Sequence, residues 1–144
     1  MSLCFIDFDY KQNGRGPTFT ELLELDERGF PVNWKISGTT TFGSPVEEYF
    51  QANDDVARWR DASGPGDANY KSDPDFYVNQ NGSSYANALL VRALLQSPDG
   101  KIPVYPSGEA SVVKRWTRRV ESGSVKADVT ECQILGLDTD PRLV

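Results

Sequence analysis

The segment SPVEEYFQANDDVARWR, residues 44–60, decides the fold class, because its pattern differs from the strand-like stretches before it. Ser44 is a suitable helix N-cap, Pro45 suits the first helical position, and Glu47 completes a capping box. Apolar and aromatic side chains then recur at helical spacing. These signals predict a helix over 45–61, which ends before the glycines and proline of SGPG at 63–66.

A second helix is predicted over 84–96, within the sequence SSYANALLVRALLQ. Ser83 or Ser84 provides the cap, and the turn-forming SPDG follows at 97–100. The apolar side chains of this segment cover most of the helix circumference, a pattern typical of a buried helix. We therefore expect the second helix to be largely buried at the centre of the core.

Alternation with a period of two predicts strands outside the two helices. LCFIDFDY at 3–10 alternates apolar residues with aspartates. TFTELLEL at 18–25 and FPVNWKI at 30–36 resemble a hairpin, with Gly29 where a turn requires a positive φ. SVKADVTECQILGL at 124–137 is a further strand.

These elements predict a single α+β domain over 1–144, with a mainly antiparallel sheet and two helices. The length of 144 residues suits one domain with a substantial core. We expect a frayed end at 137–144.

The composition favours a soluble protein of the cytoplasm. No apolar run approaches the ~20 residues of a membrane helix, and the first residues lack the basic region of a signal peptide. Cys4 and Cys132 lie at opposite ends of the chain. Without a secretion signal they are expected to be buried thiols and not a disulfide.

Histidine is absent from the chain. This excludes catalytic triads, two-histidine zinc sites and histidine-dependent nuclease mechanisms. The chemistry that remains would depend on carboxylates, Lys, Tyr or Arg. We therefore favour a non-enzymatic protein with no catalytic residue, no cofactor and no metal site.

Positive charge is concentrated near the end of an acidic chain. Residues 112–126 contain one anion, Glu121, and five cations, which are Lys114, Arg115, Arg118, Arg119 and Lys126. The segment therefore has a net charge of +4, which leaves −10 for the remainder of a chain whose total is −6. Such segregation can steer an anionic partner or ligand.

The secondary structure of this basic segment has two interpretations. As a helix over 108–122, it would place its valines and Trp116 on one stripe, with Gly123 ending it. As a strand, it would pair with the segment from Val125 onward around a turn at Ser122–Gly123. That register places Trp116 opposite Val129, but it also places Arg119 opposite Lys126. The β-branched content favours the hairpin.

The basic segment supplies the candidate site, which is an anion-recognising surface made of Lys114, Arg115, Trp116, Arg118 and Arg119. Arginine forks match phosphate or carboxylate, and a tryptophan can stack beneath a base. The alternative is that these cations only solubilise an exposed strand.

Two function classes follow from these observations. We favour a small acidic interaction protein that binds another macromolecule, such as a basic protein. In character it is similar to inhibitors and immunity-type proteins of bacteria and phages. The alternative is a binder of an anionic small ligand, a nucleotide or phosphorylated metabolite. Nucleic acid and membrane are disfavoured as partners, the former because the remaining acidic surface repels phosphate.

Overall fold

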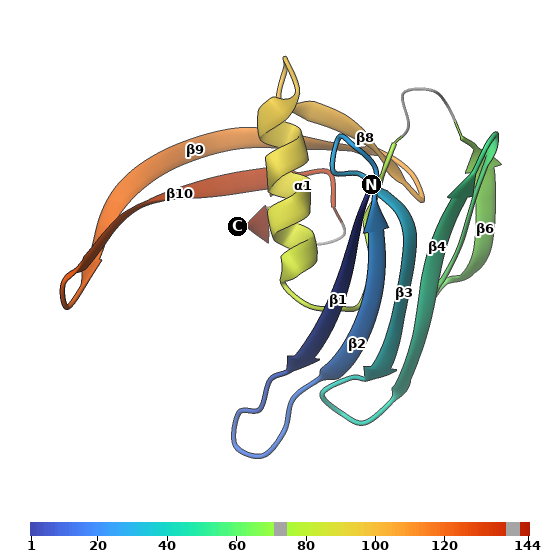
Figure 1. Cartoon of the computed structure of the whole chain (residues 1–144), viewed down its shortest axis with the longest axis horizontal. Helices are drawn as coiled ribbons and strands as arrows, with labels where there is room; N and C mark the ends of the chain where they lie inside the picture. Colours follow the sequence, from blue (N-terminus) through green and yellow to red (C-terminus); the bar gives the residue numbers. More distant parts are fainter. Residues whose placement is uncertain (71–74, 138–141) are drawn as a thin grey trace.

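The computed structural model of the chain describes residues 1–70, 75–137 and 142–144, without the side chains of 142 and 143. Strands make up 60% of the described residues and helix 9%. Within these residues the chain forms two sheets and one helix (Figure 1). The prediction of an α+β domain with two helices and mainly one sheet is therefore wrong.

The first sheet is an antiparallel meander of six strands in chain order. Its strands are β1 (Ser2–Asp9), β2 (Thr18–Leu25), β3 (Pro31–Thr39), β4 (Pro45–Asn53), β5 (Val56–Asp61) and β6 (Gly64–Asn69). The alternation predicted for β1, β2 and β3 is present. Pro65, the proline of SGPG, does not prevent strand formation, because β6 lies at the sheet edge, where proline is tolerated.

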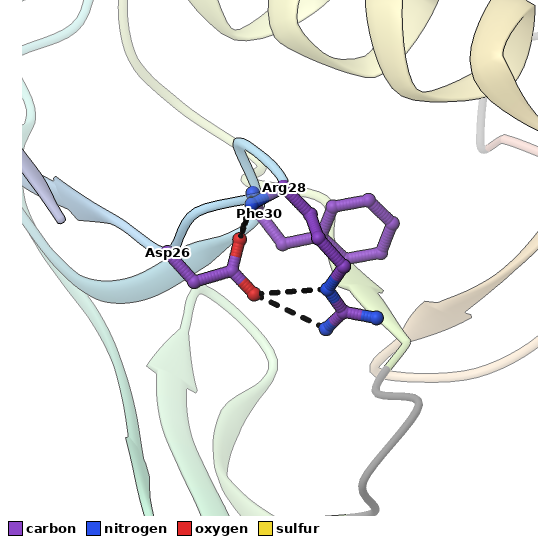
Figure 2. Close-up of polar contacts among 3 residues, drawn as sticks. All are labelled: Asp26, Arg28 and Phe30. Carbon is purple, nitrogen blue, oxygen red and sulfur yellow. Dashed lines mark hydrogen bonds and ion pairs between the residues drawn. The ribbon is translucent and has the colours of Figure 1, made fainter.

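The predicted turn between β2 and β3 is stabilised by Asp26 (Figure 2). One carboxylate oxygen accepts hydrogen bonds from the backbone N–H groups of Arg28 and Phe30, both at 2.9 Å. The other accepts from Nε and a terminal nitrogen of the Arg28 guanidinium, at 3.3 and 3.1 Å. Gly29 has a φ of 83°, as the turn prediction required.

The segment predicted as a helix over 45–61 is instead the β4–β5 hairpin, closed by a two-residue loop at Asp54–Asp55. Val46, Glu48 and Phe50 all point inward and are buried, with exposed residues between them. A buried carboxylate at the middle position interrupts the apolar alternation in the sequence, and the helix-start pattern of Ser44, Pro45 and Glu47 competed with the period of two. Asp54 adopts a φ of 41°, suited to a tight hairpin turn.

The second sheet has the spatial order β11-β10-β9-β8-β7. Its strands are β7 (Phe76–Tyr77), β8 (Lys101–Tyr105), β9 (Glu109–Ser122), β10 (Val125–Leu135) and β11 (Arg142–Leu143). The segment around 112–120 is therefore a strand, which confirms the hairpin interpretation and excludes the helix. The short strand β7 runs parallel to β8, whereas the other neighbours are antiparallel.

The helix predicted over 84–96 is α1 (Tyr85–Gln96), which packs against β8 and β9. Its burial is one-sided, so the expectation of a largely buried central helix is wrong. Arg92 is exposed, and Leu95 is 42% exposed on the outer side. The inward side is formed by Ala86, Leu89, Leu90, Ala93 and Leu94.

One hydrophobic cluster joins the two sheets and α1. At its centre Tyr77 of β7 stacks on Phe50 of β4, with ring centroids 4.6 Å apart. The same ring meets the edge of Trp34 at 6.5 Å. All three rings are fully buried, and each contributes about 1.5–3 kcal/mol of burial free energy. The single domain predicted over 1–144 is compatible with this shared core.

The predicted frayed end is described only in part. Leu137 is buried, and β11 pairs with Gln133 and Ile134 of β10. Residues 138–141 lie outside the described residues, so the prediction for 137–144 is not tested there. In the part of the chain that is described, no helix is both long and apolar enough to cross a membrane.

Candidate functional site

The β9–β10 hairpin extends far beyond the rest of the second sheet (Figure 1). β8 pairs only with Glu109–Ser111 of β9, and β11 pairs only with Gln133–Ile134 of β10. The remainder, residues 113–131, is a two-stranded projection, which we call the arm. Figure 1 shows it curving away from α1 and the first sheet toward its turn at Gly123–Ser124.

The local sequence explains why the arm is a hairpin. Valine and threonine recur in both strands and favour extended backbone. Gly123 has a φ of 59°, which the two-residue turn requires and which glycine adopts without strain. The base of the hairpin is anchored in the core by Ala110, Cys132 and Ile134, all buried.

The strand register differs by two residues from the one predicted. Trp116 pairs with Glu131 and not with Val129, and Arg119 pairs with Asp128 and not with Lys126. The turn lies one position later than expected, at Gly123–Ser124. A shift of two residues keeps every side chain on its predicted face but changes its partner across the ladder. It replaces the predicted repulsion at Arg119 with an ion pair at 3.1 Å.

Between Arg115 and the turn, one face of the arm carries only polar side chains of β9 and of residues 126–130. The register brings Thr117 opposite Thr130, with their hydroxyl oxygens 3.0 Å apart. Arg119 lies opposite Asp128, and Lys126 lies 3.3 Å from Glu121. Arg115 lies on this face as well, opposite Cys132 at the base. The polar face therefore meets most of its own hydrogen-bonding and charge requirements without a partner.

The opposite face is mostly apolar and lies open to solvent. Val125 is 65% exposed, and Val120 and Val129 are 38% and 37% exposed. Ala127 is also exposed, and Trp116 is partly exposed. We call this the apolar face of the arm. It is formed by Trp116, Val120, Val125, Ala127 and Val129, with Lys114 and Glu131 at its base end, Arg118 opposite Val129 in its middle and Ser122 beside the turn.

The five predicted ligand residues lie in one strand but do not converge. Lys114, Trp116 and Arg118 lie on the apolar face, whereas Arg115 and Arg119 lie on the polar face. Three of the four cations already have intramolecular contacts: Arg118 forms an ion pair with Glu131, and Arg119 forms one with Asp128. The Lys114 ammonium lies 5.3 Å from the centre of the Trp116 ring system. A single small ligand would meet at most one of the two sets.

The arm also carries less charge than the predicted basic segment, because Asp128 and Glu131 belong to it. Five cations oppose three anions over residues 113–131, a net of +2. Since the whole chain has a charge of −6, the remainder has −8. The sign contrast between arm and body is thus retained but reduced.

Two buried carboxylates in the first sheet were not singled out from the sequence. Glu21 accepts a hydrogen bond from Nε1 of Trp34 at 3.1 Å and another from the backbone N–H of Ser83. Glu48 accepts from the Tyr77 hydroxyl and the Gln80 N–H, both at 2.8 Å, and from the Asn81 N–H at 3.0 Å.

These carboxylates are structural. Glu21 is fully buried and Glu48 is 3% exposed, so neither is accessible to a substrate. Burial raises the pKa of Glu48 above its usual value, although its three hydrogen bonds oppose the shift. Their shared effect is to hold residues 77–83, which lead into α1, against the first sheet.

A hollow in the body of the protein and its acidic side chains were compared with the arm as alternative sites. A hollow of about 600 Å³ opens beside Trp59, Asp61 and Tyr105. None of the five predicted ligand residues lines this hollow. Among the residues that the structure describes, no three His, Cys, Asp or Glu side chains are grouped so that they could hold a metal ion.

No protein-family model, curated protein or solved structure matches this chain. The arm is thus identified as the candidate site by its own geometry, since no relative supplies a function.

The hairpin is predictable from the sequence, but the exposure of its apolar face is not. Val125, Ala127 and Val129 alternate as a half-buried strand would. The sequence therefore predicts one covered face. It contains no signal that β8 and β11 stop at the base of the hairpin and leave that face open.

Proposed function

We propose that this chain is a non-enzymatic interaction protein that binds another protein through the apolar face of its arm. The observation that carries the proposal is the exposure of that face, above all Val125 at 65%. The partner is expected to present an apolar surface of comparable width.

The isolated arm lacks the packing against other elements that stabilises a sheet. A two-stranded hairpin without a packed face is only marginally stable in water. A contiguous apolar surface on a small protein commonly marks an interaction site. A partner placed on the valines would remove apolar area from water and also order the arm, so both terms favour binding.

The charge of the arm restricts which partner it can bind. The predicted basic partner rested on the acidity of the chain, whereas the arm itself has a net charge of +2. The similarity in character to inhibitors and immunity-type proteins stays a prediction for the acidic body. Binding through the arm requires instead that the partner tolerate Lys114 at the base end of the apolar face and Arg118 in its middle.

We propose the cytoplasm as the compartment of this interaction. Cys4 and Cys132 are both free thiols in the structure. A reducing compartment keeps such thiols unpaired. Thiol titration of protein purified without reductant should therefore find two free cysteines after unfolding.

The proposal is tested with a photo-crosslinking amino acid placed at Val129 or, as a matched control, at Thr130. These neighbours lie on opposite faces of the same strand. Illumination in the cells that make the protein should yield a protein adduct from position 129 and far less from position 130. No adduct from 129, or equal adducts from both positions, would contradict the proposal.

A further inference from the structure

The first sheet has an apolar surface of its own that is exposed among the residues that the structure describes. On the outer side of β1 and β2, Leu3 is 66% exposed, Phe5 is 68% exposed, and Leu22 is 39% exposed. Phe5 lies directly opposite Leu22 in the ladder, and Leu3 is two residues away on the same face. We call these three residues the β1 patch.

Three carboxylates lie beside the β1 patch. Asp7 follows Phe5 on the outer face of β1, and Asp9 follows Asp7. Glu24 lies opposite Leu3. Neither β1 nor β2 contributes a cation to this face, although Lys11, just beyond β1, contacts Asp9 at 2.8 Å, and the exposed Lys35 of β3 lies opposite Leu22. The patch is therefore an apolar surface whose border carries three carboxylates and two lysines and is acidic on balance.

The apolar face of the arm has the complementary pattern. Its valines and Trp116 are accompanied by Lys114 and Arg118, against the single anion Glu131. Apolar side chains would meet apolar side chains, while Lys114 at the base end of the face and Arg118 opposite Val129 would lie toward Asp7 and Glu24. Complementary charge of this kind fixes orientation and disfavours other partners.

The contact cannot occur within one chain in the observed conformation. Val125 on the arm and Phe5 on the patch are both about two-thirds exposed, at 65% and 68%, so neither covers the other. Figure 1 also shows the arm extending away from the sheet that contains β1. Two uncovered, complementary surfaces on one chain can cover each other only between copies.

We propose that the arm of one copy docks on the β1 patch of a second copy. This inference rests on the proposed function and names the partner. Two copies that exchange arms reciprocally about a twofold axis would form a closed, isologous dimer, whereas head-to-tail docking would be heterologous and give a ring or an open chain.

Sedimentation velocity of the purified full chain over a concentration series tests the inference. The wild type should form dimers or larger assemblies at micromolar concentration. Val129→Asp on the arm and Phe5→Asp on the patch should each weaken association at least about tenfold, the factor that corresponds to ~1.4 kcal/mol. Wild-type chain that stays monomeric at hundreds of micromolar would overturn the inference.

Matched controls separate docking from a general loss of solubility or fold. Thr130→Asp introduces the same charge on the polar face of the arm. Phe42→Asp removes an even more exposed aromatic ring, 87% against 68% for Phe5, from a loop outside the patch. Both controls should associate like the wild type. If Phe42→Asp weakens association as much as Phe5→Asp does, the patch is not the docking surface and the inference is wrong.

Mixing the two disrupted variants gives a sharper result. Val129→Asp retains an intact patch and Phe5→Asp retains an intact arm, so an equal mixture should form a heterodimer although each variant alone is monomeric. Its affinity should be lower than that of a reciprocal wild-type dimer, because one contact remains. A mixture that stays monomeric, or a Phe5→Asp variant that associates like wild type, would overturn the inference.

The crosslinking experiment at Val129 distinguishes this inference from the proposed function. Adducts between two copies support both. A monomeric wild-type chain whose Val129 forms an adduct with a different protein overturns self-docking and leaves the proposed function in place. A monomeric chain without adducts contradicts both.

Discussion

The carboxylate of Glu48 accepts a hydrogen bond from the hydroxyl of Tyr77, 2.8 Å away, inside the core. Glu48 belongs to β4 of the first sheet and Tyr77 to β7 of the second. The pair therefore joins the two sheets at their packed interface. It also satisfies a buried carboxylate and a buried hydroxyl, each costly to leave without a partner.

Replacing Glu48 by glutamine should lower the free energy of unfolding by about 1–3 kcal/mol, because an amide nitrogen cannot accept the bonds that a second carboxylate oxygen accepts. Urea denaturation measures this loss. The control is Glu47→Gln, an exposed neighbour on the outer face, which should change stability by less than about 0.5 kcal/mol. Equal effects at the two positions would show that the buried hydrogen bonds are not important for stability.

The same carboxylate predicts a pH dependence. Because burial raises the pKa of Glu48, the folded chain holds its proton more tightly than the unfolded chain does. The contribution of Glu48 to stability should therefore fall as the pH rises from 4.5, its ordinary pKa, through the raised value. The stability of the wild type minus that of Glu48→Gln, measured at several pH values, should decrease across this range. A difference that is constant with pH would contradict the assignment.

Gly66 of β6 is required by the ring of Trp59, the residue opposite it in β5. A Cβ at position 66 would lie 2.5 Å from Nε1 of that ring. Gly66→Ala should therefore destabilise the fold by about 1–3 kcal/mol through overpacking. In a Trp59→Phe background, which lacks the indole atoms concerned, the same change should cost less. A double-mutant cycle by thermal denaturation measures this coupling, and a coupling near zero would refute the contact.

The arm's ion pairs should contribute little to global stability. Arg119 and Asp128 are 61% and 62% exposed, so solvent screens their attraction. A cycle of Arg119→Ala and Asp128→Ala should give a coupling below about 1 kcal/mol. A larger coupling would mean that the arm is folded as rigidly as the core, contrary to its two-stranded geometry.

The sequence predicted those elements whose alternation met no competing helix signal. β1, the β2–β3 hairpin and the β9–β10 hairpin were recognised in this way, although Glu21 occupies an inward position of β2, and α1 was recognised from its cap and helical spacing. β4 was not recognised, because Ser44, Pro45 and Glu47 resemble a helix start and Glu48 occupies an inward position that an apolar residue usually fills. Only the tertiary donors Tyr77, Gln80 and Asn81, about thirty residues later, make that position acceptable.

The candidate site was predictable in its location but not in its character. Charge clustering pointed to the segment that contains Arg118 and Arg119. Adjacent residues of a strand point to opposite faces, so the strand interpretation already separates these two arginines. What alternation cannot reveal is which face remains uncovered, since that depends on where β8 and β11 end.

We expect the arm to be dispensable for folding and necessary for binding. The most direct measurement compares the full chain with one in which Asn-Gly replaces residues 116–131, joining the paired residues Arg115 and Cys132 by a two-residue turn. Both chains, purified from cells that make the protein, are examined by native mass spectrometry. We predict a folded, shortened chain without the bound protein that accompanies the full chain. A shortened chain that keeps this partner, or that cannot fold, would contradict the account.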